Sequence, residues 1–499
     1  MKNFVAEITV VVDSIGTEQT FLFGTAGFTT LPSDTPANTY VAARLKNAGT
    51  MRRELFSGTR VTGAVRPSFG ELVLINADGG LDAWMGYGIS GGKVVVRMGE
   101  EGAAYPAGYT TVYIAYAQHI VADFREIRVR LRDRLTLLDR PLVTASFDGS
   151  GGLEGTTGMA GKLKQWVSSD PGFIPPVLVD AALQLYFVQS TGTGGIGALF
   201  SLYEGGVPIT RDANYASASD CLSVSPAAGE CRFWLGSGGN GPVYVRLGSV
   251  PKFDLRVFSG GYQSNGSSWS LPAMAALAGI TGGTGALVVG AQLVDDSRII
   301  LEVMQDACIS AFGWFGMTRL DVFRCGTLSE PDASTVHNFN EHNAKAWTRA
   351  PVHDMDAPVW SVSVHAGKTW PGNLATGASS TMADYIGRTP WWTSFAEEDA
   401  SIKTAHPGAV AVVVETQARN FPNRLAQTQY RDKFFSLYGV LREFYTFTTP
   451  LTEQALALEL HDTVQIKLPR FGLNSGKNMR IITQDIDCTR RQITFGVWG

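Results

Sequence analysis

Arg125-Glu-Ile-Arg-Val-Arg-Leu-Arg-Asp133 is the clearest β-strand signal in the chain. Its apolar residues Ile127, Val129 and Leu131 alternate with three arginines, and a period of two places alternating residues on opposite faces of a sheet. The apolar face is therefore predicted to be buried. We expect the arginine face to be solvated or salt-bridged, with a contact between subunits as the alternative.

Outward from this strand, the rest of the first 150 residues also predicts strands. Residues 4–12 alternate weakly, and short apolar runs next to glycine lie at 71–75 and 93–98. The 56 glycines, many of them in doublets, are typical of turns between short strands. The C-terminal part returns to alternation, with apolar residues at Leu456, Leu458, Leu460, Val464, Ile466, Leu468, Ile493, Phe495 and Val497.

Two segments predict helices instead. The first spans 295–314 and can be capped by Asp296 or Ser297, and its apolar residues from Ile300 to Ala311 fall on one face. Cys308 lies on that face and is interpreted as a small core residue. The second spans 424–444 and carries an aromatic stripe at helical spacing, which usually packs against a sheet. The predicted fold class is therefore mostly β with a few helices, in a multidomain α+β arrangement.

A chain of 499 residues is too long for one ordinary core, so we expect three or four domains. Charged residues make up only 17%, against a typical share of roughly 25%, and the low charge hints at a surface covered within an assembly. Composition divides the chain into an N-terminal β domain (1–150), a connecting segment (151–190), a Gly/Ser-rich small β domain or insertion (191–285), a helix-containing α+β domain (286–350) and a C-terminal α+β domain with closing strands (351–499).

Charge and cysteine usage exclude several classes of protein. The net charge of −4 gives no basic footprint for nucleic acid or an anionic membrane. The five cysteines form no C-x-x-C pair, so a disulfide framework is not expected, although Cys221 and Cys231 are close enough in sequence to pair. We expect no secretion signal at the N-terminus, which lacks a sustained apolar region, and no membrane-spanning segment, because no run of about 18 apolar residues occurs.

Two catalytic motifs match in sequence but fail in context, and a third matches only in part. Gly192-x-Gly194-x-x-Gly197 fits the dinucleotide fingerprint, yet the segment after it is too short for the helix that would hold a pyrophosphate. Gly88-Ile-Ser90-Gly-Gly92 matches a nucleophile elbow but precedes a strand, so Ser90 is predicted in a hairpin turn. Gly367-Lys-Thr369 resembles a phosphate loop, but Val362 stands where the first glycine must be.

The best candidates for metal ligands are His337, Glu341 and His342, with His353, Asp354 and Asp356 nearby in sequence. Zinc hydrolases place two histidines one helical turn apart, whereas a gap of five residues does not do this. We therefore interpret these histidines as polar loop residues. The pair Glu397-Glu398 lies in a polar run and is interpreted as a solvated face. We predict no catalytic residue, no metal site and no cofactor.

Two groups of motifs then carry a resemblance. The N-terminal group is VAARLKNAGT at 41–50, GAVRPSFGELVLINADGGLD at 63–82, RDRLTLLD at 132–139 and LEG at 153–155. The C-terminal group is LHDTV at 460–464, PRFGL at 469–473, Gly476-Lys477 and ITFGVWG at 493–499. Both resemble tail-tip proteins of siphophages, especially Mu-like phages with long non-contractile tails. Residues 203–215 and 244–249 resemble the insertion that such proteins carry.

The resemblance implies a baseplate or tail-tip hub with β-barrel-like domains related to tail-tube subunits. Such hubs are usually homotrimeric rings within the virion, assembled in the host cytoplasm. They join the tail tube and distal tail protein above to the spike or tail-fibre proteins below, surround the end of the tape-measure protein and open for DNA ejection. Some relatives bind an iron–sulfur cluster through clustered cysteines, but the cysteines here are scattered, so no cluster is expected.

The resemblance also gives the C-terminal motifs structural roles. Pro469 would end a strand, and Gly472 and Gly476 would permit the turn before the next one. Leu458, Leu460, Val464 and Ile466 would line a barrel core, and the final Trp-Gly would be packed rather than frayed.

Three other functions stay open at this stage. One is a distal tail ring or fibre-anchoring protein, in which case the ring could be hexameric. Another is a cell-wall hydrolase carried on the tail, although no motif supports it. The third is a carbohydrate-binding receptor module in residues 190–285, where aromatic side chains that can stack on sugars more often fill a small core: Tyr203, Trp234, Tyr244, Tyr262 and Trp269.

Overall fold

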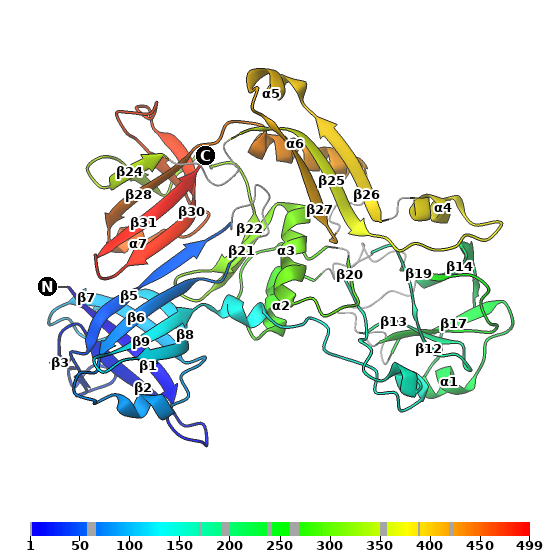
Figure 1. The fold of residues 1–499 in the computed structure, drawn as a ribbon, viewed down its shortest axis with the longest axis horizontal. Coiled ribbons are helices and arrows are strands. Elements are labelled where there is room, and N and C mark those ends of the chain that lie inside the picture. Colours follow the sequence, from blue (N-terminus) through cyan, green and yellow to red (C-terminus); the bar gives the residue numbers. More distant parts are fainter. Residues whose placement is uncertain are drawn as a thin grey trace.

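The computed structural model describes residues 2–56, 66–168, 171–190, 200–236, 242–259, 269–290, 292–349, 357–387, 390–418 and 424–499. Strands dominate these residues, and the helices are few and mostly short (Figure 1). The prediction of a mostly β, multidomain fold is confirmed.

The largest element is a 13-stranded sheet built from both ends of the chain. In Figure 1 the blue N-terminal strands and the red C-terminal strands meet on the same side of the molecule. The strand order is β2 (Glu18–Gly24), β1 (Lys2–Val11), β7 (Lys93–Glu100), β8 (Tyr109–Ala122), β9 (Glu126–Arg132), β6 (Phe69–Ile75), β5 (Leu45–Glu54), β30 (Lys477–Asp487), β31 (Gln492–Trp498), β28 (Phe444–Pro450) and β24 (Lys345–Arg349). The branch β23 (His337–Phe339) and β29 (Thr463–Ile466) joins it at β30.

The N-terminal half of this sheet curls. β1 lies against β5, although four strands separate them in the strand order, and Phe23 of β2 forms an isolated bridge to Ala42 just before β5. Among the described strands no ladder joins β2 to β5. The curl therefore resembles a barrel without being closed. A short ladder between β3 (Phe28–Thr29) and β4 (Tyr40–Val41) lies beside it.

Strand β9 confirms the alternation that the sequence predicts. Ile127, Val129 and Leu131 are fully buried, whereas the side chains of Arg128 and Arg130 are about half exposed, at 48% and 50%. Arg130 forms an ion pair with Glu71 on β6 at 2.8 Å, and Arg128 approaches Glu126 at 3.6 Å. The arginine face is therefore solvated and salt-bridged, as expected.

The first predicted helix is shorter than the sequence indicated. α3 spans Ile300–Ala311, and neither Asp296 nor Ser297 caps it. Residues 298–300 instead run beside residues 140–142, where the amide of Ile300 donates to the Arg140 carbonyl at 3.0 Å, so the helix cannot begin earlier. The predicted apolar face is correct up to Cys308, which is buried in the core. Trp314 lies outside the helix, on β21 (Gly313–Met317).

The second predicted helix also ends early. α6 spans Arg424–Tyr438, and the Arg442 guanidinium donates to the carbonyls of Leu437 and Ser436 at its C-terminus. Leu441 is half exposed, and Phe444 already belongs to β28. The described aromatic residues of its stripe are buried, and α6 packs against β25 (Val359–Lys368), as predicted.

Residues 456–460 do not form the strand that their alternation indicated. Leu456 lies in α7 (Glu453–Ala457), where the Thr452 hydroxyl caps the helix by accepting from the amide of Ala455 at 3.2 Å. Leu458 and Leu460 follow in irregular structure, yet all three leucines are buried, as are Val464 and Ile466. The pattern therefore identified core residues correctly and assigned the wrong backbone conformation to three of them.

The C-terminal turn follows the prediction in its glycines but not in Pro469. β29 already ends at Ile466, three residues before Pro469, so the proline does not end the strand. Gly472 and Gly476 both adopt positive φ angles, at 73° and 83°, and β30 begins directly afterwards at Lys477. Trp498 is buried, and the amide of Gly499 donates to the carbonyl of Glu443 at 3.0 Å. The C-terminus is thus packed.

The middle of the chain forms separate smaller sheets. In Figure 1 they extend away from the large sheet, with α3 between the two parts. One sheet holds β12 (Val177–Asp180), β13 (Leu185–Gln189), β18 (Val243–Leu247), β17 (Glu230–Trp234) and β16 (Thr210–Arg211). Another holds β11 (Phe173–Ile174), β19 (Leu255–Ser259), β14 (Phe200–Glu204) and β15 (Val207–Pro208). Both contribute side chains to one apolar cluster, which includes Phe233 and Val257.

The remaining elements connect these parts. They are the pair β10 (Trp166–Ser168) and β20 (Gln292–Val294), the hairpin of β21 and β22 (Phe323–Thr327), and a sheet of β26 (Trp391–Glu398), β25 and β27 (Val410–Thr416). The other α-helices are α1 (Ala218–Ser223), α2 (Leu271–Leu277), α4 (Ser380–Gly387) and α5 (Ala400–Ala405). Short 3-10 turns are η1 (Asp82–Gly86), η2 (Arg134–Leu138), η3 (Gly152–Glu154) and η4 (Thr157–Met159). None of the helices in the described residues is both long and apolar enough to cross a membrane.

Candidate functional site

Buried side-chain hydrogen bonds gather where the two ends of the chain meet. β5 pairs with β30 in antiparallel register from Glu54 opposite Thr483 to Thr50 opposite Asp487. The hairpin β21–β22 and the loop that follows it lie against this seam. Three arginines, Arg53, Arg319 and Arg480, tie these elements together. We call this region the arginine junction.

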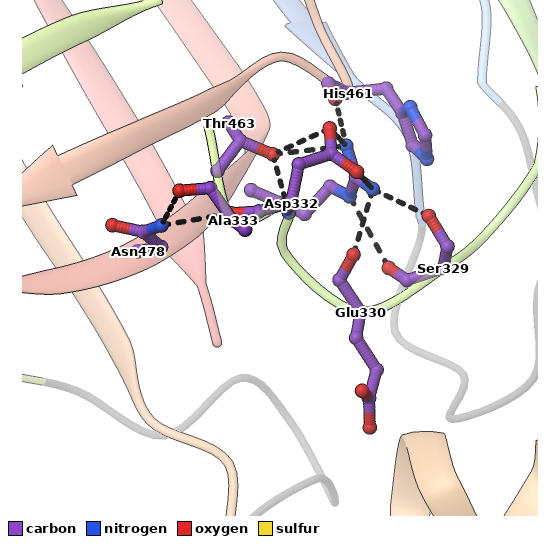
Figure 2. Close-up of polar contacts among 8 residues, drawn as sticks. Ser329, Glu330, Asp332, Ala333, His461, Thr463 and Asn478 are labelled. Carbon is purple, nitrogen blue, oxygen red and sulfur yellow. Dashed lines mark hydrogen bonds and ion pairs between the residues drawn. The ribbon is translucent and has the colours of Figure 1, made fainter. Parts of the chain in front are cut away.

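Arg480 holds the loop after β22 against the C-terminal strands. It lies on β30 with its side chain only 3% exposed, and it forms an ion pair with Asp332 at 3.0 Å. Its other acceptors, drawn in Figure 2, are the carbonyls of Ser329, Glu330 and His461 and the hydroxyls of Ser329 and Thr463. Hydrogen bonding from Arg480 lowers the pKa of Asp332. All three guanidinium nitrogens therefore have partners, which is what a buried arginine requires.

Asn478, two residues earlier on β30, holds the same loop. Its side-chain amide donates to the carbonyls of Asp332 at 2.8 Å and Ala333 at 3.0 Å (Figure 2). Because Asn478 and Arg480 point to the same side of the strand, the loop is fixed at two successive positions. Residues 329–333 are thereby attached to the C-terminal part of the sheet rather than to the hairpin that precedes them.

Arg53 joins three parts of the chain with one side chain. It lies on β5 with its side chain 1% exposed, and it donates to the Met317 carbonyl at 3.1 Å and to Glu459 at 2.6 Å. It also donates to the side-chain oxygen of Gln484 on β30. The N-terminal strands, the central hairpin and the C-terminal strands thus share one buried guanidinium.

Arg319 extends this network to β8. Its guanidinium donates to the carbonyls of Thr111 and Val112 on β8 and to the Leu456 carbonyl of α7. Glu459 lies 3.9 Å from Arg319 and thus serves both this arginine and Arg53. The cavity left at the junction measures about 10 Å³, room for one water at most. The junction is therefore packed closed.

His461 packs beside this network and supplies one of its acceptors. Its ring stacks on Trp314 with 4.7 Å between ring centroids, and its carbonyl accepts from Arg480. Burial, together with the charge of Arg480, lowers the pKa of His461 to about 3. The imidazole is therefore neutral at physiological pH, and its Nε2 atom is buried without a hydrogen-bond partner.

The residues proposed from sequence as metal ligands do not converge. His337 lies half buried on strand β23, not in a loop as predicted, and its ring contacts Phe339. Glu341 and His342 are exposed on the following turn. His353, Asp354 and Asp356 lie outside the described residues. Within the described part of the chain, no three His, Cys, Asp or Glu side chains are grouped so as to hold a metal ion.

The other motifs have structural roles where they are described. Ser90 lies in a turn that leads into β7, as predicted, but the turn belongs to no hairpin, because η1 precedes it and β7 pairs with β1 and β8. Lys368 and Val362 lie on β25, and Glu397 and Glu398 lie on β26. The motif Gly192-x-Gly194-x-x-Gly197 lies outside the described residues.

The candidate sugar-stacking aromatics mostly serve as core. Trp234 and Tyr244 are buried in one apolar cluster. Tyr203 packs on Phe173, and Trp269 packs partly buried on Trp166. Tyr262 lies outside the described residues. All five cysteines are buried free thiols, so Cys221 and Cys231 do not pair.

Sequence reasoning missed the arginine junction. The only signal near it was the LHDTV motif at 460–464, whose His461 and Thr463 supply two of the acceptors of Arg480. Arg53 and Arg480 themselves stand in strands where nothing distinguishes a buried arginine from an exposed one.

Comparison with known proteins gives only distant likenesses. No protein-family model matches the chain, and no curated protein sequence matches it. Among solved structures, the tail protein from Neisseria meningitidis MC58 is 9% identical with a TM-score of 0.42, and the match covers 99% of this chain and 96% of that one. The 43 kDa tail protein of prophage MuSo2 from Shewanella oneidensis is 8% identical with a TM-score of 0.38, covering 100% and 96%.

A third likeness is to a chain of the virion of a native gene transfer agent particle. It is 13% identical with a TM-score of 0.37, and the match covers 68% of this chain and 84% of that one. At TM-scores below 0.5, these likenesses establish neither a shared fold nor a shared function.

Proposed function

We propose that this chain is a structural protein of a tailed bacteriophage, a subunit of the tail-tip or baseplate hub of a siphophage. In this proposal it joins the tail tube and distal tail protein to the spike or fibres, surrounds the end of the tape-measure protein and gates DNA ejection. It acts as a homotrimer in the virion and catalyses no reaction. Residues 1–150 and 351–499 supply its hub domains, and residues 191–285 form an insertion.

One observation carries the proposal. The sequence motifs that resemble tail-tip hubs lie at opposite ends of the chain, and β5 and β30 bring those ends into one sheet. Buried arginines then bind that sheet to the centre of the molecule. A rigid joint of this kind suits a protein that transmits force between neighbouring subunits, because its domains cannot slide past one another without breaking buried charged hydrogen bonds.

The first test is the mass of the purified chain by light scattering, alone and mixed with the neighbouring tail proteins of the same phage. We expect a trimer, or a monomer that forms a ring only with those partners. A stable monomer that does not bind the neighbouring tail proteins would contradict the proposed hub function.

Two assays separate the hub from its rivals. A wall hydrolase should clear peptidoglycan on a zymogram, and a receptor module should bind whole host cells. The hub should do neither. Clearing that disappears when one carboxylate or histidine is substituted would replace the proposal with an enzyme.

A further inference from the structure

The tip of the β8–β9 hairpin displays an aromatic side chain with no contacts of its own. Phe124 is 100% exposed, and Val121 beside it is 50% exposed. The turn itself is ordered, because the Asp123 carboxylate accepts from the amides of Arg125 at 2.8 Å and Glu126 at 2.9 Å. A fixed turn that holds a phenyl ring fully in water forgoes the stabilisation that burial of the ring would give, and a partner that covers the ring would supply it.

The opposite end of the same hairpin carries a pocket of about 280 Å³. Its lining includes Ser90, Tyr116, Ala117, Arg132, Thr136 and Leu137. Leu137 is 44% exposed, so an apolar wall of the pocket is open to water. The Tyr116 hydroxyl donates to Asp321 at 2.7 Å, and Arg134 at the rim donates to the same carboxylate at 2.8 Å. The walls are therefore held in place before anything binds.

Size and charge match the tip to the pocket. A dry cavity of about 150 Å³ is enough to accept benzene, whereas pockets for small-molecule ligands usually begin at about 300 Å³. A pocket of about 280 Å³ therefore suits one large apolar side chain. Among the described residues, neither Asp123 at the tip nor Arg132 at the pocket forms an ion pair with another side chain. Insertion of Phe124 would bring this carboxylate toward this guanidinium.

We propose that Phe124 of one copy of the chain inserts into the Leu137 pocket of a neighbouring copy. This inference rests on the proposed function, because it names the contact that builds the hub ring. A single copy cannot make the contact, since the length of β9, Glu126–Arg132, separates tip from pocket by roughly 20 Å. Tip and pocket are different surfaces, so the contact is heterologous, and it closes a ring where the rotation between copies is a whole fraction of a turn, one third in the proposed trimer.

Cysteine cross-linking tests the contact directly. Phe124→Cys and Leu137→Cys are made as separate proteins, mixed under assembly conditions and oxidised; the five native cysteines are buried and do not compete. We expect a disulfide-linked two-chain product from the mixture and not from either protein alone. The matched control pairs Leu137→Cys with Ile15→Cys, which stands 88% exposed at the tip of a different hairpin and should give no product.

A second variant measures the contribution of the side chain. Phe124→Ala should leave thermal unfolding of the monomeric chain unchanged, because the ring contacts nothing in its own subunit. It should raise the dissociation constant of the ring roughly 30-fold, the fold-change of an interface hot spot.

The outcomes are distinguishable. A wild-type chain that forms rings, together with no cross-link and unchanged assembly of Phe124→Ala, would overturn this contact and leave the hub standing. A wild-type chain that stays monomeric alone and with its tail partners would overturn both. Product from the Ile15→Cys control in equal yield would also overturn the contact, because the linkage would then be unspecific.

Discussion

The same large sheet uses arginine in two opposite ways. At the junction, Arg53 and Arg480 are 1% and 3% exposed and donate to carbonyls and carboxylates from distant parts of the chain. On β9, Arg128 and Arg130 are about half exposed and pair with glutamates on the same or the adjacent strand. Removing one partner of a buried charged pair costs about 3–5 kcal/mol, whereas an exposed pair contributes roughly 0–1 kcal/mol. Exposure therefore decides which arginines hold the molecule together.

Removal of the C-terminal strands should have the largest effect. A chain truncated after Pro469 loses β30 and β31, leaves β5 and β28 as unpaired edges and removes Arg480 from the junction. We expect loss of the folded state and aggregation, because exposed edge strands pair with other chains. Far-UV circular dichroism and solubility are compared with those of the full chain. A soluble truncated protein with the full strand signal would contradict the account.

Substitution of single arginines tests the contrast itself. Arg480→Met should lower the free energy of unfolding by about 3 kcal/mol, because the carbonyls of Ser329, Glu330 and His461 lose their charged donor. The matched control Arg130→Met should lower it by less than about 1 kcal/mol. Denaturant unfolding of both proteins measures the difference. Equal losses would show that burial does not separate the two groups.

The pH dependence of stability should identify His461. Burial and the charge of Arg480 lower the pKa of His461 from 6.5 to about 3. Between pH 6.5 and pH 3, the imidazole therefore binds a proton in the unfolded chain but not in the folded chain. The free energy of unfolding should therefore fall as the pH drops from about 6.5 toward 3. His461→Phe keeps the stack on Trp314 and removes the titrating group. It should reduce the fall between pH 7 and pH 4 by roughly 3 kcal/mol.

Other groups do not obscure this comparison. Burial raises the pKa of Asp133 and of Asp306 to about 6, which gives the opposite slope, but both titrate in the wild type and in His461→Phe and cancel in the difference. If the free energy of unfolding of the two proteins changed with pH in the same way, the pKa of His461 would not be lowered by folding.

The smallest effect is expected for the ion pair of Arg130 with Glu71. A double-mutant cycle with alanine at both positions should give a coupling of about 0.5 kcal/mol that decreases in 1 M salt. A coupling of several kcal/mol would mean that this exposed pair stabilises the fold as strongly as the buried arginines do, which would contradict the contrast between the two regions.

Much of the fold was predictable from sequence, because buried apolar residues recur at the spacing of a strand or a helix. The alternation in 127–131 and in 493–497 gave strands with the correct buried face, and the apolar face of α3 gave the correct core residues. Helix ends were less predictable. α3 begins late because residues 140–142 bind the segment before it, and α6 ends early where Arg442 binds its last carbonyls.

The junction was not predictable, because its partners are remote in sequence. Arg53 binds Met317, Glu459 and Gln484, which are 264 to 431 residues away. No local pattern records such contacts. Leu456 shows the converse: its alternation with Leu458 correctly reports burial, but the cap at Thr452 decides the backbone in favour of a helix.

The most direct test of the central claim, that the arginine junction couples the two ends of the chain, is hydrogen–deuterium exchange of Arg480→Met. Arg480 lies on β30, whereas β5 belongs to the N-terminal part of the chain and pairs with it. We predict that peptides covering β5 (Leu45–Glu54) and β30 lose protection together, while those covering β13 in the smaller sheet keep theirs. Loss of protection confined to residues 329–333 and the C-terminal strands, with β5 unchanged, would contradict the coupling.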